Sequence, residues 1–219
     1  MAEPDFNKLL LLLCSWLAYF FVHTLLASLT IKKWFSKQFP EYFHWYRLGY
    51  NLIAIVLLIV PLVLTFIWRS ELIIDWQGPF QWVSWGLTLI ALLGFAATAS
   101  IYDGGHFLGI AQVKQKEKAL LDQEQFTISW FHHYVRHPWY FLGLLFIWSR
   151  DMDIYQLTST GLVSLYLVIG SYLEEKKLIC IYGQRYREYC RKVPGLIPVP
   201  WKFLTKQQAQ SLLEKQVNS

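Results

Sequence analysis

The chain has 219 residues, of which 55% are hydrophobic and 16% are charged. Soluble domains carry about 25% charged residues, so this composition predicts a membrane protein and disfavours a soluble enzyme. The net charge of +5 lies mostly after Leu173, which favours anionic lipid headgroups over nucleic acid as a partner. The cysteines Cys14, Cys180 and Cys190 show no C-x-x-C spacing, so they predict neither a disulfide framework nor a structural zinc site.

Five apolar runs predict an all-α, polytopic integral membrane protein, because a helix needs about 20 apolar residues to cross a bilayer. The first run is longer than the apolar core of a signal peptide, so we expect a helix there. The fourth run is short, and we expect its helix to start early and take Arg136 into the membrane interface. Residues 1–219 then form a single membrane domain. The expected helices comprise residues 9–31, 48–68, 80–102, 134–149 and 154–173.

The distribution of Lys and Arg predicts the orientation in the membrane. Their numbers before, between and after the five runs are 1, 4, 1, 4, 1 and 9. Cytoplasmic loops carry the excess of positive charge, so we expect the N-terminus outside and residues 174–219 in the cytoplasm. Apolar residues at helical spacing alternate with Lys and Arg in the first part of this tail. That pattern predicts an amphipathic cytoplasmic extension.

Two polar clusters flank the last two expected helices. Arg136 and His137 precede the fourth helix, and Glu174 and Glu175 follow the fifth. The intervening turn, residues 149–153, is so short that the two helices must return as an antiparallel pair. The clusters should therefore be neighbours on the cytoplasmic side. Charge placed against apolar helices is costly and usually functional, so this is the candidate site.

A metal ion is the first ligand to consider at this site. His133 and His137 would share one helix face at the spacing i and i+4, and together with an acidic residue they could bind zinc or iron. His132 lies next to this pair, and the remaining histidines, His23, His44 and His106, are scattered along the chain. We therefore predict no metal site.

A small charged cofactor suits the same residues better. Arg136 and His137 can bind a carboxylate, and Glu174 or Glu175 can accept hydrogen bonds from an ammonium group or ribose hydroxyls. Tyr140, with its neighbour Trp139, can face a cation. S-adenosylmethionine carries all of these groups. The structural alternative is that the charges only extend to the membrane surface and that the aromatic residues are interfacial anchors.

Several segments, in this order, resemble the isoprenylcysteine carboxyl methyltransferase and phospholipid methyltransferase superfamily. The segments in the C-terminal half are residues 134–140, 173–178, 182–189 and 193–198. Those in the N-terminal half are residues 23–28, 46–51 and 102–112, and they are most similar to the bacterial branch that contains the NnrU-like proteins and the membrane methanethiol S-methyltransferases. The resemblance covers nearly the whole chain.

The resemblance implies an integral enzyme of the bacterial inner membrane that takes a methyl group from S-adenosylmethionine in a cytoplasm-facing pocket. The matching cofactor-binding residues are Gln112, Arg136, His137, Pro138, Tyr140, Glu174 and Glu175. Among these, Arg136 and Glu175 are the expected catalytic residues, with Arg136 orienting the methyl acceptor. We expect the acceptor to be a small thiol, as in the conversion of methanethiol to dimethyl sulfide, or a similar lipophilic molecule.

Other functions remain open at this point. Within the superfamily they are a carboxyl or phospholipid-amine methyltransferase and an NADPH-dependent sterol reductase. A non-catalytic membrane protein of the NnrU type is the alternative from another class. It is favoured by two departures from the family pattern, which usually has glycine where this chain has Trp130 and Leu142.

Overall fold

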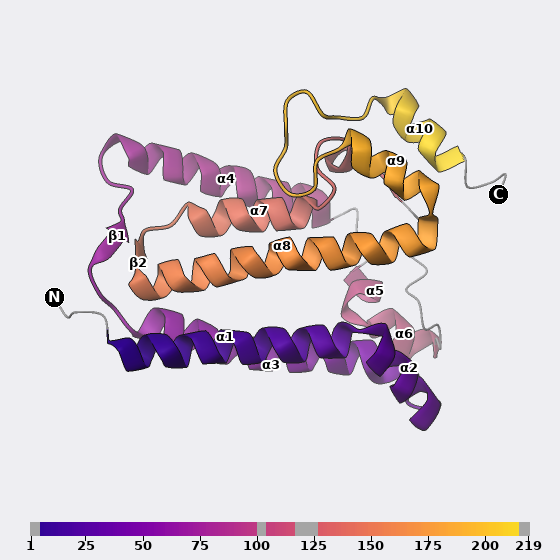
Figure 1. Ribbon diagram of the computed structural model, residues 1–219, viewed down its shortest axis with the longest axis horizontal. Helices are drawn as coiled ribbons and strands as arrows, with labels where there is room; N and C mark the ends of the chain where they lie inside the picture. The colour runs from indigo at the N-terminus through magenta and orange to yellow at the C-terminus, as the bar shows by residue number, and fades with distance from the viewer. Residues whose placement is uncertain (1–4, 100–103, 117–126, 215–219) are drawn as a thin grey trace. The chain divides into compact units, whose positions relative to one another are not determined.

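A computed structural model describes residues 5–99, 104–116 and 127–214 of the chain (Figure 1). The chain divides into two compact units. The first comprises residues 1–75, 102–123 and 151–162, and the second comprises residues 76–101, 124–150 and 163–219. Apart from two short strands, the regular structure in the described ranges is helical, which confirms the expected fold class.

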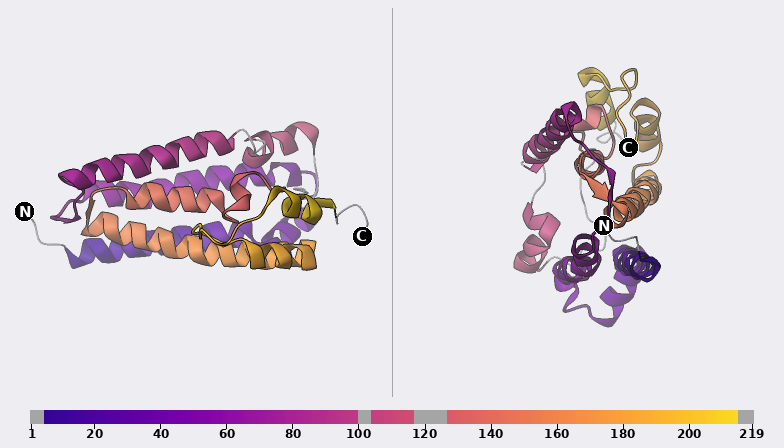
Figure 2. Two further views of the ribbon diagram at one scale, coloured as in Figure 1. Left: turned by 90° about the horizontal axis from the view of Figure 1, so that it is seen from above. Right: turned by 90° about the vertical axis from the view of Figure 1, so that its left-hand side faces the viewer.

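The first unit is built on two long apolar helices, α1 and α3, that lie side by side (Figures 1 and 2). Asp5 caps α1, because its carboxylate accepts a hydrogen bond from the backbone N–H of Asn7 at 2.8 Å. The elements of this unit are α1 (Phe6–Ala27), α2 (Leu29–Gln38), η1 (Phe43–Trp45), α3 (Tyr46–Ile67), β1 (Leu72–Ile74), α5 (Gly104–Leu108), α6 (Ile110–Gln115), β2 (Met152–Asp153) and the beginning of α8 (Ile154–Tyr182).

Polar side chains tie these helices together where no water is available to satisfy them. The indole N–H of Trp16 in α1 donates to the Ser159 hydroxyl in α8 at 2.9 Å. The same hydroxyl lies 2.7 Å from that of Thr65 in α3. Buried polar groups of this kind are stabilising only when they are paired, so the three residues set how these helices pack.

Three segments expected outside the membrane meet at one end of the first unit. β1, in the loop after α3, pairs antiparallel with β2, in the turn before α8. The backbone N–H of Asp5, at the start of α1, donates to the Tyr155 hydroxyl at 3.1 Å. This grouping is the one that five membrane crossings require.

The opposite end of the first unit gathers two segments expected inside. Arg47 and Asn51 of α3 donate to the Phe107 carbonyl at 3.1 and 3.0 Å. Gly109 has a φ of 91°, and a Cβ there would lie 2.5 Å from the backbone nitrogen of Leu48. Only glycine meets both conditions, so this residue lets the segment lie directly on α3.

The second unit packs α4 (Pro79–Ala99) against α7 (Pro138–Trp148), as Figure 2 shows. At one end of this pair the Ser84 hydroxyl donates to the Ser149 carbonyl at 2.7 Å.

The C-terminal part of the chain belongs to the second unit as well. It consists of the end of α8, α9 (Gln184–Lys192) and α10 (Lys206–Glu214). The segment between α9 and α10 packs against η2 (Phe131–His133). Their buried side chains form a small core of Tyr186, Tyr189, Val193, Leu204, Ala209 and Leu212.

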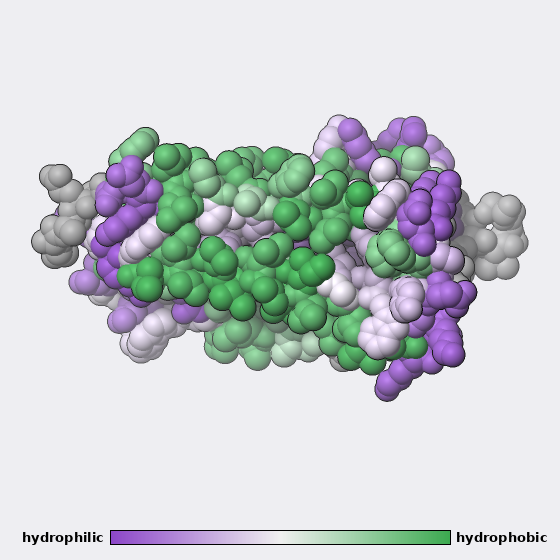
Figure 3. All heavy atoms as spheres, turned by 90° about the horizontal axis from the view of Figure 1, so that it is seen from below, coloured by the Kyte–Doolittle hydropathy of each residue, from purple (hydrophilic) through white to green (hydrophobic). Residues whose placement is uncertain are grey.

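Four helices are long and apolar enough to cross a membrane: α1, α3 together with η1, α4 and α8. On α1 and α3, large apolar side chains such as Phe21 and Leu52 are more than half exposed. Figure 3 shows this face as an apolar field with hydrophilic residues toward both ends. Such a surface suits hydrocarbon and not water, which confirms an integral membrane protein.

The fifth expected span differs from the prediction. We expected a helix over residues 134–149, but α7 comprises only 11 residues. At about 1.5 Å per residue it covers roughly 16 Å of the ~30 Å hydrocarbon layer. The reason lies in its first residues: the backbone N–H groups of Arg136 and His137 donate to the carbonyls of Pro194 and Gly195, and helix formation begins only at Pro138.

Other boundaries also differ from the prediction. The first expected helix, residues 9–31, ends at Ala27, because Ser28 is extended and caps the start of α2. The last apolar helix runs on to Tyr182, so Glu174 and Glu175 lie within α8 and not after it. α4 is described to Ala99, and residues 100–102 of the expected third helix lie outside the described ranges.

Candidate functional site

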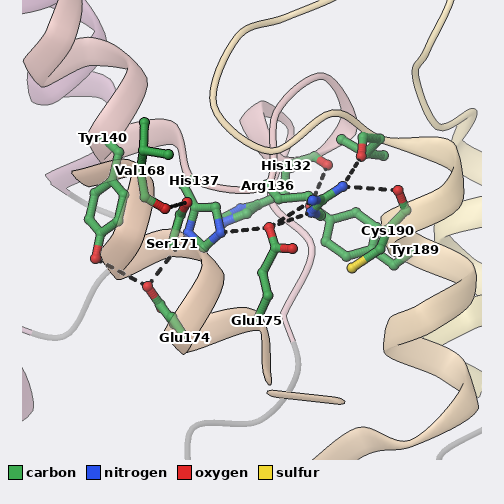
Figure 4. A network of polar contacts seen from close by, with 11 residues as sticks. His132, Arg136, His137, Tyr140, Val168, Ser171, Glu174, Glu175, Tyr189 and Cys190 are labelled. Atoms are coloured by element: carbon green, nitrogen blue, oxygen red, sulfur yellow. Dashed lines mark hydrogen bonds and ion pairs between the residues drawn. The ribbon is translucent and has the colours of Figure 1, made fainter. Parts of the chain in front are cut away.

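The two predicted polar clusters meet in the second unit. Arg136 and His137 immediately precede α7, and Glu174 and Glu175 lie on the last turns of α8 (Figure 4). The C-terminal end of α9 approaches from the other side with Cys190 and Val193. The structure therefore brings the two polar clusters together, as expected from the sequence.

An ion pair joins the two clusters. The Glu175 Oε1 atom accepts from Arg136 Nε at 2.9 Å and lies 2.7 Å from Nη2 of the same guanidinium. Nε2 of His137 is 3.0 Å from this oxygen as well. The side chains of Arg136 and Glu175 are only 12% and 17% exposed. Replacing either partner of such an ion pair is costly, because the other partner is left as an unpaired charge with little access to water.

The same guanidinium also holds the end of α9. Arg136 Nη1 donates to the Cys190 carbonyl at 2.9 Å and to the Val193 carbonyl. The last carbonyls of a helix lack partners within the helix, so these two hydrogen bonds cap α9. Arg136 thus fastens three parts of the chain: the start of α7, the end of α8 and the end of α9.

Glu174 has a more open environment. Its side chain is 46% exposed, and its Oε2 atom accepts from the Tyr140 hydroxyl at 3.2 Å. The same oxygen lies 3.5 Å from Nδ1 of His137. The rings of His137 and Tyr140 are stacked, with centroids 5.2 Å apart and planes 15° from parallel. The two glutamates therefore differ: one is locked in an ion pair and the other faces outward.

The capacity left for a ligand is uneven. Four of the five N–H groups of Arg136 are donated within the described part of the chain, and one on Nη2 is left. Among the same residues Glu175 Oε2 has no hydrogen-bond partner, and neither does Glu174 Oε1. The formal charges of Arg136, Glu174 and Glu175 add up to −1. The cluster fits a ligand with a net positive charge, an ammonium group or hydroxyls, and at most one close anionic contact.

The neighbouring histidines have structural partners. His133 Nδ1 is 2.8 Å from the Leu204 carbonyl, and the backbone N–H of Leu204 donates to the His133 carbonyl at 2.9 Å. His132 lies 2.7 Å from the Ser129 hydroxyl through Nδ1, and its carbonyl accepts from the Tyr189 hydroxyl. Within residues 5–99, 104–116 and 127–214, no group of three His, Cys, Asp or Glu side chains is placed to hold a metal ion.

Burial shifts the pKa of three groups around the site. It lowers the pKa of His132 to about 4, helped by the nearby His137 and His133. It raises the pKa of Tyr186 and that of the Cys190 thiol. All three groups are therefore neutral at pH 7.

Pro138 takes the first position of α7, where its missing N–H costs nothing. It therefore starts the helix directly after His137.

Gln112 belongs to the first unit, where its side-chain amide donates to the His106 carbonyl at 3.1 Å. Its part in the site stays a prediction.

The two departures from the family pattern lie away from the charged cluster. Leu142 is 1% exposed, and its side chain occupies the space over Gly94 of α4, where a Cβ would come within 2.5 Å of Leu142 Cδ2. Trp130 is largely exposed and stacks on Phe131. The leucine is thus accommodated by a glycine on another helix, and it does not fill the space beside Arg136. The feature that favoured a non-catalytic protein has a packing explanation.

Sequence reasoning missed the backbone partners of Arg136. The carbonyls of Cys190, Val193, Pro194 and Gly195 take part in the cluster, but a carbonyl carries no residue-specific pattern. The only hint was the motif at residues 193–198, which follows the two charged motifs in the chain.

The chain has distant relatives among known proteins. No protein-family model and no solved structure matches the chain. The methanethiol S-methyltransferase of Pseudomonas deceptionensis is 28% identical over 191 residues, which cover 80% of this chain and 67% of that protein. The one from Crocosphaera subtropica is 29% identical over 189 residues, with 80% and 69% covered. The one from Mycobacterium tuberculosis is 26% identical, with 81% and 73% covered. The chain is a distant homologue of the methanethiol S-methyltransferases, a family of membrane methyltransferases.

Proposed function

We propose that this chain is an integral membrane methyltransferase that uses S-adenosylmethionine and methylates a small thiol such as methanethiol. The observation that carries the proposal is the cluster of Arg136, His137, Tyr140, Glu174 and Glu175 in a homologue of the methanethiol S-methyltransferases. We further propose that the site faces the cytoplasm of a bacterial inner membrane.

The charges of the cluster suit this cofactor. When bound, S-adenosylmethionine supplies a methyl group activated by a sulfonium, and with its ammonium and carboxylate it has a net charge of +1. The formal charges of Arg136, Glu174 and Glu175 add up to −1. Glu174 Oε1 and Glu175 Oε2 are the free acceptors for an ammonium group or ribose hydroxyls. Tyr140, held by Glu174, presents a ring beside this negative charge, which favours a cation.

The structure changes the role that we propose for Arg136. From the sequence we expected it to orient the methyl acceptor. Because four of its N–H groups are committed to Glu175 and to the end of α9, we now propose that Arg136 is first a positioning residue. It fixes the Glu175 carboxylate, whose free oxygen is the cofactor contact. Gln112 is a further candidate contact on the strength of the resemblance alone.

The chain need not provide a nucleophile of its own. A thiol reacts as its thiolate, and methyl transfer depends on holding this sulfur in line with the methyl group and away from water. The partly buried cluster at the start of α7 and on the last turns of α8 can provide that placement. A small apolar thiol can reach it from the membrane. Methanethiol is the acceptor that the homologues' names suggest.

The test is methyl transfer by the purified protein in detergent or nanodiscs. We expect dimethyl sulfide, detected by gas chromatography, when S-adenosylmethionine and methanethiol are supplied together. Glu175→Ala and Arg136→Ala should lose this activity, whereas Gly161→Ala, at a position with no neighbour within 4 Å of the added Cβ, should keep it. Cofactor binding without transfer to any thiol would remove the proposed acceptor and leave the methyltransferase.

A further inference from the structure

The segment between α9 and α10 is held against the start of α7 at both of its ends. The carbonyls of Pro194 and Gly195 accept backbone hydrogen bonds from the two residues that precede α7, at 2.9 and 3.1 Å. At the other end, the backbone N–H of Leu204 donates to the His133 carbonyl at 2.9 Å. Figure 1 shows the residues between these bonds as a loop. The loop therefore has a defined place beside an apolar helix.

This loop presents its large apolar side chains to the outside. Trp201 is 78% exposed, Ile197 is 67% exposed, and Phe203 is also exposed, all within seven residues. The Phe203 ring stacks with that of Tyr134, at the start of α7, with centroids 6.4 Å apart, and Tyr134 is itself exposed. Exposed apolar side chains that gather in one place mark a surface for a protein or a membrane. Tryptophan and tyrosine in particular are enriched where a membrane protein passes from hydrocarbon to water.

The charge of the segment favours a membrane as the partner. From Glu188 to Glu214 the chain has four basic residues and no acidic residue between them. Lys202 stands between the tryptophan and the phenylalanine and is exposed, as are Lys192 and Lys206. Basic residues at a membrane surface are attracted by anionic lipid headgroups. Apolar and basic side chains in one loop thus match the two layers of a lipid interface.

The backbone of the loop also suits this environment. Unpaired backbone N–H groups oppose entry into a membrane. Pro198 and Pro200 have no N–H group, and the backbone N–H of Lys202 donates to the Val199 carbonyl at 3.0 Å. Three of the loop's backbone positions therefore need no water.

We propose that residues 197–203 form an interfacial anchor: Ile197, Trp201 and Phe203 insert into the headgroup region of the membrane, and Lys202 binds anionic headgroups. The lipid surface is the partner because the loop continues the exposed apolar surface at the start of α7. The anchor holds the segment that is bonded to Arg136 and His137 close to the bilayer. It does not depend on methyl transfer or on S-adenosylmethionine.

The test measures how deeply a fluorescent label on this loop lies in the bilayer. Single cysteines are introduced after serine has replaced the three native ones, and each labelled chain is placed in nanodiscs of phosphatidylcholine and phosphatidylglycerol, one chain per disc. Labels on Ile197→Cys and Trp201→Cys should lose most of their quenching by acrylamide. Lipids with a nitroxide about 5–10 Å into the headgroup and acyl boundary should quench them instead. A label on Ser211→Cys, exposed on α10, should show the opposite pattern.

A second substitution tests whether the apolar side chains cause the insertion. Trp201→Asp in the Ile197→Cys chain should return the label to water, because a charged side chain opposes entry into the membrane. Gln207→Asp adds the same charge at an exposed position of α10 and should leave the label shielded.

Three results would overturn the anchor. The first is a pair of labels, at Ile197 and Trp201, that acrylamide reaches as easily as the label at Ser211. The second is shielding that Trp201→Asp leaves unchanged. The third is shielding that appears only with two chains in one disc, which would mean that a second copy covers the loop. Thermal unfolding shows that each labelled chain is folded, and the two label positions check each other.

Discussion

Glu174 and Glu175 are adjacent in the chain, yet their surroundings assign them different tasks. Glu175 lies in the ion pair with Arg136, and its side chain is 17% exposed. The side chain of Glu174 is 46% exposed, and its carboxylate accepts a hydrogen bond from the Tyr140 hydroxyl. Glu175 is therefore needed for the structure of the cluster, whereas we expect that Glu174 can change with little effect on folding.

Substitution by glutamine should separate the two glutamates. We expect Glu175→Gln to lower the free energy of unfolding by roughly 2–4 kcal/mol, because it leaves Arg136 without its partner. We expect Glu174→Gln to cost less than about 1 kcal/mol, as for exposed charges. Both should weaken S-adenosylmethionine binding about tenfold. Thermal unfolding and calorimetry measure the two effects; equal destabilisation by both substitutions would contradict the assignment.

His132 should make folding sensitive to acid. Burial lowers the pKa of this side chain to about 4 in the folded chain, from the 6.5 of an unperturbed histidine. The unfolded chain therefore takes up the proton first as the pH falls, and stability is lost between pH 6.5 and about 4, by up to roughly 3 kcal/mol. Above pH 6.5 this contribution is fully present.

The matched variant is His132→Asn, whose side-chain oxygen can still accept from the Ser129 hydroxyl. Its thermal midpoint should fall less than that of the wild type between pH 7 and pH 4.5. Identical pH profiles for the two proteins would show that another group titrates.

At the scale of single elements, α7 depends on what it packs against. Leu142 fits over Gly94 of α4, and the end of α7 is held by the hydrogen bond from Ser84 to the Ser149 carbonyl. Lipid tails are as apolar as the helix surfaces, so the hydrophobic effect does not drive helices together within a membrane. Close packing and polar contacts of this kind drive their association instead. The position of α7, and with it Arg136, is therefore set by α4.

A double-mutant cycle tests this packing. Gly94→Ala places a methyl group 2.5 Å from Leu142 Cδ2, and we expect a loss of about 1–3 kcal/mol of stability from overpacking. Leu142→Ala alone should cost roughly 2–4 kcal/mol through the cavity that it leaves. The double variant should be more stable than the sum of the two losses predicts, as measured by thermal or denaturant unfolding. Simple additivity would mean that the two residues do not share this space.

The start of α7 shows where sequence patterns lose their predictive power. Apolar runs predicted the existence of all five helices, because burial in lipid requires long uncharged segments. They did not predict that residues 134–137 stay non-helical, because this depends on hydrogen bonds to Pro194 and Gly195, some 60 residues away. The charged residues of the site, in contrast, were visible because charge is rare beside apolar helices.

On the scale of the whole molecule, the contacts of the first unit agree with the count of Lys and Arg in the loops. The start of α1, β1 and β2 meet at one end, and Arg47 meets the segment at Phe107 at the other. Five crossings require this pairing, but their number stays a prediction, because four helices are long enough to span a membrane in the described part of the chain. Which end faces the cytoplasm follows from the positive charges alone, so the orientation is a prediction.

Cysteine labelling in intact cells tests the orientation. In a variant with Cys14, Cys180 and Cys190 replaced by serine, we expect Glu71→Cys to react with a membrane-impermeant maleimide from outside. Both Glu71 and Ser211 are exposed. Ser211→Cys, in the tail, should react only after the cells are opened. The reverse pattern would place the proposed site on the wrong side for a cytoplasmic cofactor.

The central claim is that the cluster of Arg136, His137, Glu174 and Glu175 binds S-adenosylmethionine. The most direct measurement is the calorimetric titration of the detergent-purified chain with this cofactor, alongside Arg136→Ala. We expect saturable binding by the wild type at one site per chain, weakened at least about tenfold in the variant. A folded wild-type protein that takes up no S-adenosylmethionine, or a variant that binds it equally well, would contradict the claim.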